Sequence, residues 1–182
     1  MNRVTLVVLA LGLGCGADPA PVSAPTPQEP VVPQQPGVPF DEAAVVCCSS
    51  ERVRRVVAEY LDMQRALARD DLPLVQAELQ ALRGVSLDAA AATDISSHSR
   101  GLAQQVAGLL EPVAGGGLEK IRGEFVEVSN KVIVLVQANQ GGSKQVAVAF
   151  CPSANANWLQ AEPEILNPFL GTLDPSSGSF RR

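Results

Sequence analysis

The chain has 182 residues and a formal net charge of −5. Proteins that bind nucleic acids usually carry a basic stripe with interleaved aromatic side chains, and this sequence has neither. The composition therefore argues against a nucleic acid as partner.

The N-terminus is typical of an export signal. Arg3 precedes the apolar run Val4–Leu13, and Cys15 follows directly between two glycines. The run has ten residues, whereas a membrane-spanning helix needs about 20. A cysteine at this place is the residue that a lipoprotein-type signal peptidase leaves at the new N-terminus, where it carries acyl chains. We therefore predict a signal peptide over residues 1–14 and lipidation of Cys15, with ordinary secretion and a free Cys15 as the alternative.

The residues after Cys15 predict a location and a tether. Gly16 lacks the acidic signal that retains lipoproteins in the inner membrane of enteric bacteria. By that analogy we expect a lipid-anchored protein of the cell envelope, at the outer membrane and facing the periplasm. Eight of the 14 prolines lie between Pro19 and Pro39. Residues 15–43 should therefore form the anchor site and an extended linker, in which the segment from Pro19 to Pro39 alone reaches roughly 60 Å at about 3.1 Å per residue.

The remaining residues, 44–182, have the size of one domain, and four segments have the apolar spacing of amphipathic helices. The segments run from Ser49 or Ser50 to Asp70, from Leu72 to Gly84, from Ser86 or Asp88 to Pro112, and from Leu118 to Leu135. Their apolar stripes can be buried only against one another, and the connections are short. We predict a mainly α fold, an up-and-down four-helix bundle.

The pattern changes after Gly141. The segment Gln145–Phe150 is short and β-prone, which predicts a strand that ends at Cys151. We expect the following residues to be loop, with a turn of helix at Glu162–Leu166. A second strand near Leu173 or Ser179 would complete a small C-terminal β-hairpin.

The C-terminal segment also carries short motifs in a defined order. They are Cys151-Pro152, Trp158-Leu159 and Asn167-Pro168-Phe169-Leu170-Gly171. This series resembles the signature of the bacterial domain of unknown function 3347, which typically reads Cys-Pro-Met-Ala, Trp-Leu, Asn-Pro-Tyr-x-Gly and Met-Leu-x-Cys-Gly. Upstream, Tyr60-Leu61, Asp70-Asp71 and Phe125 resemble helical parts of the same family. The resemblance covers about Val53 to Gly178.

The resemblance implies an exported domain that occurs alone or joined to periplasmic parts of copper and silver efflux systems. It therefore implies that the domain handles Cu(I) or another soft metal ion as its cofactor. Ser153 and Ser177 stand where the family has Met and Cys, and thioether and thiolate donors are the ones that select Cu(I). Two hypotheses follow. The chain is an envelope lipoprotein that binds copper-group ions for efflux or detoxification, or it is a metal-free module of the same fold that contacts efflux or other periplasmic proteins.

The candidate metal ligands are Cys151, Cys47, Cys48 and His98. Cys151 is a ligand, half of a disulfide or a buried small residue. Cys47 and Cys48 precede the first helix, whose positive end would favour thiolates. Adjacent cysteines bridge each other only with strain, so we expect a bridge from one of them to Cys151. His98 lies on the apolar stripe of the predicted third helix, where it is a hydrogen-bonded core residue or a ligand.

The sequence gives no sign of catalysis. A nucleophile elbow of the form Gly-x-Ser-x-Gly is absent, and Gly115-Gly116-Gly117 lacks the Gly-Lys-Ser/Thr ending of a phosphate loop. We predict a protein that is not an enzyme.

Overall fold

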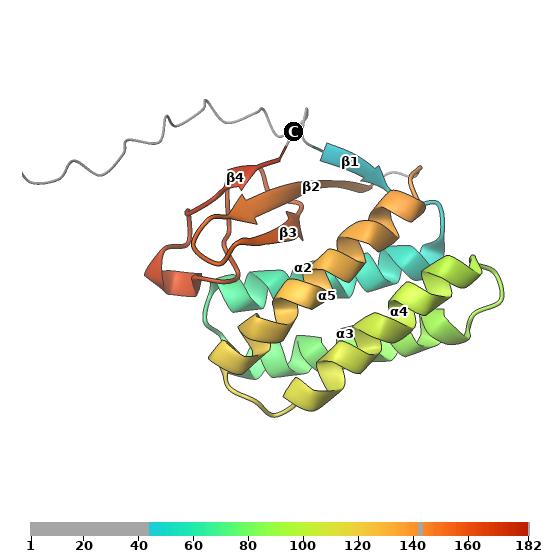
Figure 1. Ribbon diagram of the computed structural model, residues 1–182, viewed down its shortest axis with the longest axis horizontal. Helices are drawn as coiled ribbons and strands as arrows, with labels where there is room; N and C mark the ends of the chain where they lie inside the picture. Colours follow the sequence, from blue (N-terminus) through green and yellow to red (C-terminus); the bar gives the residue numbers. More distant parts are fainter. Residues whose placement is uncertain (1–43, 142–143, 182) are drawn as a thin grey trace, which may run out of the picture. The chain divides into compact units, whose positions relative to one another are not determined.

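The computed structural model describes residues 44–141 and 144–181. The signal peptide predicted over residues 1–14, the lipidation site Cys15 and the linker up to residue 43 lie outside the described residues. The described part contains four α-helices and a small antiparallel sheet (Figure 1). The elements in chain order are β1 (Ala44–Cys47), α2 (Glu51–Ala68), α3 (Leu72–Ala91), α4 (Ser97–Leu110), η1 (Glu111–Val113), α5 (Leu118–Ala138), β2 (Lys144–Cys151), β3 (Ala156–Gln160), η2 (Gly171–Leu173) and β4 (Ser179–Phe180).

The helices form the predicted mainly α up-and-down bundle. Each helix packs against the next one along the chain, and α5 also returns to α2, which closes the bundle. The apolar spacing explains this packing, because α2 buries Val53, Val57 and Tyr60 on one face and α5 buries Phe125 and Val132 on one face.

The boundary between the second and third helices was predicted wrongly. Helix α3 does not end at Gly84 but continues to Ala91, and α4 begins only at Ser97 rather than near Ser86 or Asp88. Ser86 is fully buried on the side of α3 that faces the core, so the packing continues beyond the glycine. A glycine inside a helix costs only about 1 kcal/mol relative to alanine, and this packing outweighs it.

The sheet is built around β2. Strand β3 pairs with one edge of β2, opposite residues 147–151. Strands β1 and β4 share the other edge, because β1 pairs with residues 144–147 and β4 with residues 149–150. The predicted strand Gln145–Phe150 is confirmed within β2, and the predicted strand near Ser179 is confirmed as β4.

Two further expectations for the chain around the sheet were wrong, and one strand was not anticipated. Residues 156–160 form β3, although their short sequence was assigned to a loop. Residues 44–47 form β1, ahead of the first predicted helix. The segment Glu162–Leu166 contains no helical turn, because two carbonyl groups of this segment accept hydrogen bonds from the buried Gln160 amide. This amide holds the segment as an irregular loop against the end of β3.

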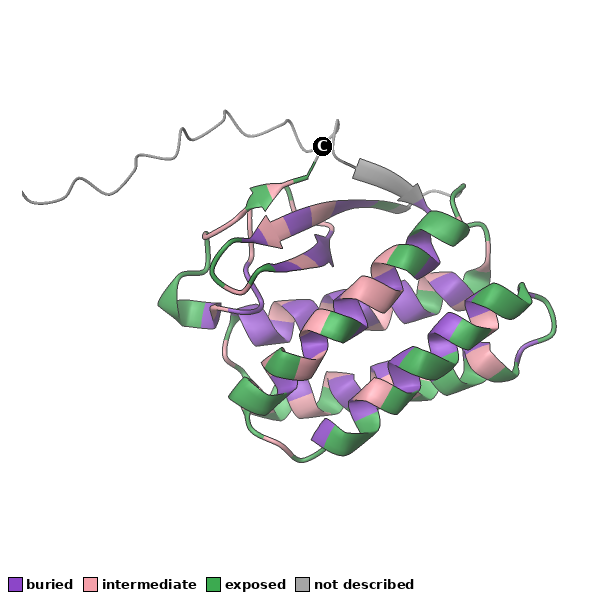
Figure 2. Cartoon of the chain, viewed as in Figure 1, coloured by how far each residue is buried: buried purple, intermediate pink, exposed green. Residues whose placement is uncertain are grey.

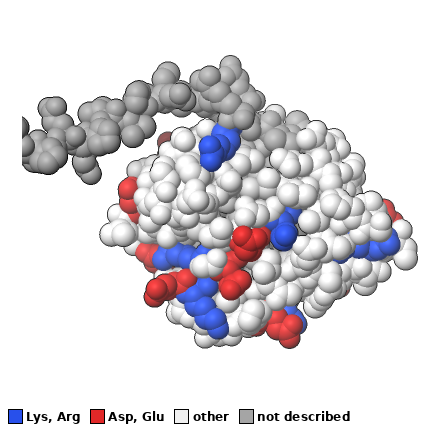
Figure 3. Space-filling view, in the orientation of Figure 1, with Lys and Arg blue, Asp and Glu red and all other residues white. Residues whose placement is uncertain are grey.

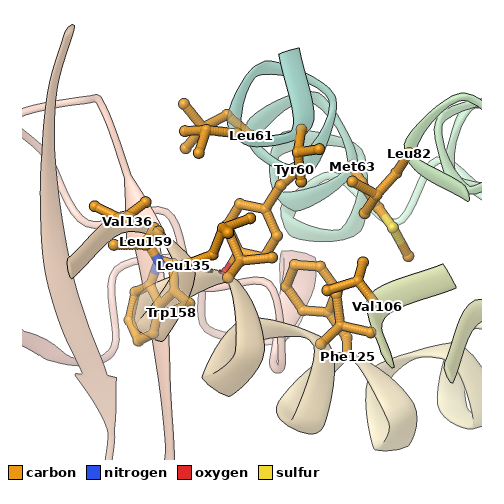
Figure 4. Packing of buried hydrophobic residues seen from close by; sticks show 14 of the residues in the cluster. Tyr60, Leu61, Met63, Leu82, Val106, Phe125, Leu135, Val136, Trp158 and Leu159 are labelled. Atoms are coloured by element: carbon orange, nitrogen blue, oxygen red, sulfur yellow. Dashed lines mark hydrogen bonds between the residues drawn. The ribbon is translucent and has the colours of Figure 1, made fainter. Parts of the chain in front are cut away.

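The core lies between the helices and continues beneath the sheet, as the buried residues in Figure 2 show. At its centre the rings of Tyr60 and Phe125 are stacked with centroids 5.1 Å apart. Figure 4 shows Trp158 of β3 on the sheet side of this stack. The sheet and the bundle thus share one hydrophobic core.

Candidate functional site

The adjacent cysteines lie where β1 leads into α2. Both residues are fully buried, and they are joined to each other in a disulfide across a cis peptide bond. Backbone hydrogen bonds hold this corner to the end of α5. The amide of Ser49 donates to the carbonyl of Asn139 at 3.1 Å, and Cys47 pairs with Gln140.

The predicted bridge from this pair to Cys151 is wrong. Cys47 lies opposite Lys144 at the first residue of β2, whereas Cys151 is the last residue of this eight-residue strand. At about 3.3 Å per residue the two ends of the strand are about 23 Å apart. The Cα atoms of a disulfide lie roughly 4.4–6.8 Å apart, so neither cysteine of the pair can reach Cys151.

Cys151 is a buried free thiol at the opposite end of the sheet. Its Sγ accepts a hydrogen bond from the amide of Ala154 at 3.4 Å. Continuing the pairing of Phe150 with Ser179 by one residue places Gly178 beside Cys151. Gly178 has φ +127°, and a Cβ there would lie 2.7 Å from the carbonyl oxygen of Phe150. The end of the signature therefore packs against its beginning, and glycine is required at this contact.

His98 does not lie on the buried side of a helix, so the expectation of a core histidine was wrong. It is exposed at the second residue of α4, because this helix begins later than predicted. The buried neighbour Ser99 contacts the core instead and accepts a hydrogen bond from Asn139 at 3.0 Å. The four predicted soft-metal ligands are therefore not brought together. Cys151 lies at the far end of β2 from the cysteine pair. His98 is exposed, whereas the three cysteines are buried.

Asn167 organises the loop that carries the rest of the signature. Its side chain is fully buried, and its Oδ1 accepts hydrogen bonds from the amides of Phe169 and Leu170. Its Nδ2 donates to the carbonyl of Ser177 at 2.7 Å. Asn167 therefore closes the loop on itself, which is a structural role for the Asn-Pro motif.

An ion pair between α5 and the turn after α2 clamps this loop to the bundle. Arg122 forms the ion pair with Asp70 and donates to the carbonyl of Pro168 at 2.8 Å. Asp70 also accepts hydrogen bonds from the hydroxyl and, at 2.9 Å, the amide of Thr172. These hydrogen bonds from Thr172 and Arg122 lower the pKa of Asp70 to about 2. The sequence marks Asp70 as the end of a helix and as part of the family resemblance, but it does not predict this ion pair.

A second polar contact lies inside the core. The hydroxyl of Tyr60 is 2.8 Å from the hydroxyl of Ser129 and accepts a hydrogen bond from the amide of Leu159. Burial raises the pKa of Tyr60, so the group stays neutral. Figure 4 shows this side chain between α2 and the strand that carries Leu159. The contact joins the bundle and the sheet.

Three carboxylates form a cluster that sequence reasoning missed. Glu59 and Asp62 are three residues apart on α2, and Glu78 faces them from α3, with one oxygen of each within 4.8 Å of the others. Burial raises the pKa of Glu78, and the neighbouring charges of Asp62 and Glu59 raise it further. Arg65 pairs with Asp62 and competes with any cation for this carboxylate. The cluster has the hard oxygen donors that suit Mg²⁺ or Ca²⁺ rather than Cu(I).

The surface shows no separate patch of basic side chains on the face drawn in Figure 3. There, basic and acidic side chains are mixed over the first turns of α5, and much of the remaining face is uncharged. Among the described residues, no helix combines the length and the apolar character needed to cross a bilayer. Comparison with known proteins finds no matching family model, curated protein or solved structure. The resemblance to domain of unknown function 3347 stays a prediction from the sequence motifs.

Proposed function

We propose that this chain is a non-enzymatic, lipid-anchored protein of the bacterial envelope. Its folded domain would then act as a tethered module that contacts another envelope protein without a bound soft metal ion. The apolar run that stops at Cys15 and the proline-rich residues that follow support the anchor and the tether. The motif resemblance supports a domain of the efflux-associated kind.

The distance between the cysteines along β2 favours the metal-free module over the copper-binding domain. Cys151 lies about 23 Å from the residue opposite Cys47, and Cu(I) prefers two or three soft ligands in direct contact. The disulfide also occupies both sulfur atoms of the cysteine pair. The described part of the oxidised domain thus offers one free thiol, Cys151, whereas tight Cu(I) binding needs two or three soft ligands.

The C-terminal loop supports a role in contacting a protein. Leu173 is 86% exposed, the highest value among the large hydrophobic residues of the described part. The loop beneath it is held by Asp70, Arg122 and Asn167. An apolar side chain on a rigid support suits docking, because little conformational freedom is lost when a partner binds.

Cu(I) titration of the purified oxidised chain tests this proposal. We expect no stoichiometric binding in competition with a Cu(I) chelator. Tight binding of one ion to the oxidised wild type, lost in Cys151→Ser, would contradict it. For the anchor, Cys15→Ala should move the protein from the membrane fraction to the soluble fraction, and retention in the membrane fraction would contradict lipidation.

Copper-group ion handling is the second candidate function, and one observation favours it. Cys47 and Cys48 are adjacent, so their reduction yields two sulfur donors at one place. In that case the reduced protein should bind at most one Cu(I). Binding should be lost in Cys47→Ser and kept in Cys151→Ser, which assigns the ion to the pair.

A further inference from the structure

The Cys47–Cys48 disulfide differs from disulfides that stabilise a fold by cross-linking distant parts of the chain. The two residues are neighbours in sequence, so their bond closes no loop of chain and contributes little of the stabilisation that a disulfide derives from restricting the unfolded state. A structural role therefore does not account for the bond. We propose that the pair is a reversible thiol–disulfide exchange site whose reaction partner is a dithiol, either a small molecule or a dithiol protein.

The start of α2 supplies an environment that stabilises the thiolate formed on reduction. Cys48 lies two residues before Ser50, the N-cap of this 18-residue helix, and the Ser50 side chain makes no capping hydrogen bond. The positive end of the helix is therefore not neutralised by its own cap. The guanidinium of Arg54 lies at this corner, since its Nη1 donates to the Cys48 carbonyl at 2.9 Å, and it is also ion-paired with Glu51 of the first turn. A thiolate beside a helix N-terminus and a cation is the arrangement found in reactive cysteines.

The reaction partner must come from outside the described part of the chain. Cys151 is the one free cysteine there, and the length of β2 separates it from the pair. The disulfide is therefore not able to exchange with Cys151 within the folded domain. Access to the buried sulfur atoms requires movement of β1, which is a four-residue strand at the edge of the sheet. Short edge strands open at lower free energy than the core does.

The exchange is balanced as a two-electron reaction. A thiolate of the dithiol attacks one sulfur atom of the pair, the Cys47–Cys48 bond breaks, and the other sulfur atom leaves as a thiolate. The second thiol of the partner, after losing its proton, attacks the mixed disulfide and releases the first cysteine. Two electrons and two protons are thereby transferred from the partner, which becomes a disulfide, to the pair, which becomes two thiols.

Thiol counting on the full-length Cys15→Ala chain tests the proposal. The folded protein is equilibrated with mixtures of reduced and oxidised dithiothreitol, quenched with acid, and then unfolded and alkylated for mass spectrometry. We expect one alkylated thiol under oxidising conditions and three under reducing conditions, with helical circular dichroism unchanged between them. Re-oxidation should restore one.

Two variants make the result specific. When Cys151→Ser is added to the Cys15→Ala chain, the count should rise from zero to two at the same dithiothreitol ratio. Cys48→Ser in the same chain should show no step of two thiols. Three thiols in the Cys15→Ala chain under oxidising conditions would overturn the proposal. Reduction that occurs only together with the loss of the helical signal would also overturn it, because the bond would then be a closed part of the folded core. Neither result bears on membrane anchoring, and the Cu(I) titration of the oxidised chain remains a separate measurement.

Discussion

The backbone of Gly171 lies directly against the carboxylate of Asp70, at a place where a Cβ would collide with both Asp70 and Arg122. The two residues are far apart in sequence and meet because the C-terminal loop folds back onto the turn after α2. Gly171 also has φ +56°, a conformation that costs an L-residue about 1–2 kcal/mol. The glycine that ends the Asn-Pro motif is thus required both by backbone conformation and by contact.

Gly171→Ala should lower the free energy of unfolding by at least about 2 kcal/mol, because it combines backbone cost with displacement of the ion pair. Gly115→Ala is the matched control. Gly115 has φ +75°, but nothing lies within 4 Å of a Cβ there. Chemical denaturation of both variants measures the difference, and equal losses of stability would show that the contact with Asp70 is unimportant.

Asp70→Asn should remove the charged hydrogen bonds but keep the backbone, since asparagine tolerates the φ of +57° at this position. We expect a loss of about 1–3 kcal/mol at pH 7. Because folding lowers the pKa of Asp70 from 3.8 to about 2, its stabilisation is complete above pH 3.8 and is lost as the pH falls through about 2.

Denaturation at several pH values tests the predicted loss of this stabilisation in acid. The stability difference between wild type and Asp70→Asn should shrink below pH 4 and vanish near pH 2. Asp71→Asn serves as the control, because asparagine also caps a helix such as α3 and should change stability little. A difference that is independent of pH would mean that Asp70 acts through packing rather than charge.

Gly101 and Gly108 lie inside α4 on its exposed side, and nothing lies within 4 Å of a Cβ at either position. Gly101→Ala and Gly108→Ala should therefore each raise the free energy of unfolding by about 0.5–1 kcal/mol. Gly116→Ala provides the contrast, since its Cβ would lie 3.0 Å from the carbonyl oxygen of Val113. The melting temperatures of Gly101→Ala and Gly108→Ala should therefore lie above that of Gly116→Ala. A loss of stability in Gly101→Ala would contradict this prediction.

Glu78→Gln should raise the free energy of unfolding at pH 7 by about 0.5 kcal/mol or less, which would appear as a slightly higher melting temperature. Folding raises the pKa of Glu78, so its charge destabilises the fold above that pKa, and the cost disappears as the pH falls below it. The gain from glutamine should accordingly fade under acid conditions. Glu124→Gln on α5 is the control for removing one charge. A lower melting temperature in Glu78→Gln would show that the carboxylate makes a favourable contact.

The helices could be predicted because apolar spacing alone determines which sides of them are buried. Val53, Tyr60 and Phe125 all lie in the core, at positions set by the three-four spacing of their segments. The prediction that a helix ends at Gly84 was wrong because one glycine adds only a local free-energy cost. The length of α3 is decided by the packing of its whole buried face against the core. The late start of α4 then explains why His98 is exposed.

The sheet and the cysteine pairing could not be predicted because they depend on contacts between distant segments. Strand β3 has only five residues and gains its stability from pairing with β2 and from burying Trp158. The opposite positions of Cys47 and Cys151 follow from the register of β1 on β2, which no local pattern encodes. For the same reason the contact between Gly171 and Asp70 could not be predicted, although Gly171 belongs to a motif that is recognisable in the sequence.

The shared edge of β2 brings the two ends of the described domain together. Ala44 pairs with Ala147 and Phe180 with Ala149, so the first and last strands meet end to end on one neighbour. Their partners are two residues apart, which corresponds to about 7 Å along a strand. The last strand of the domain therefore ends close to the start of its first strand. A short peptide that joined these ends, with new termini opened in the connection between α3 and α4, would leave every helix and strand uncut, so the fold is suited to circular permutation.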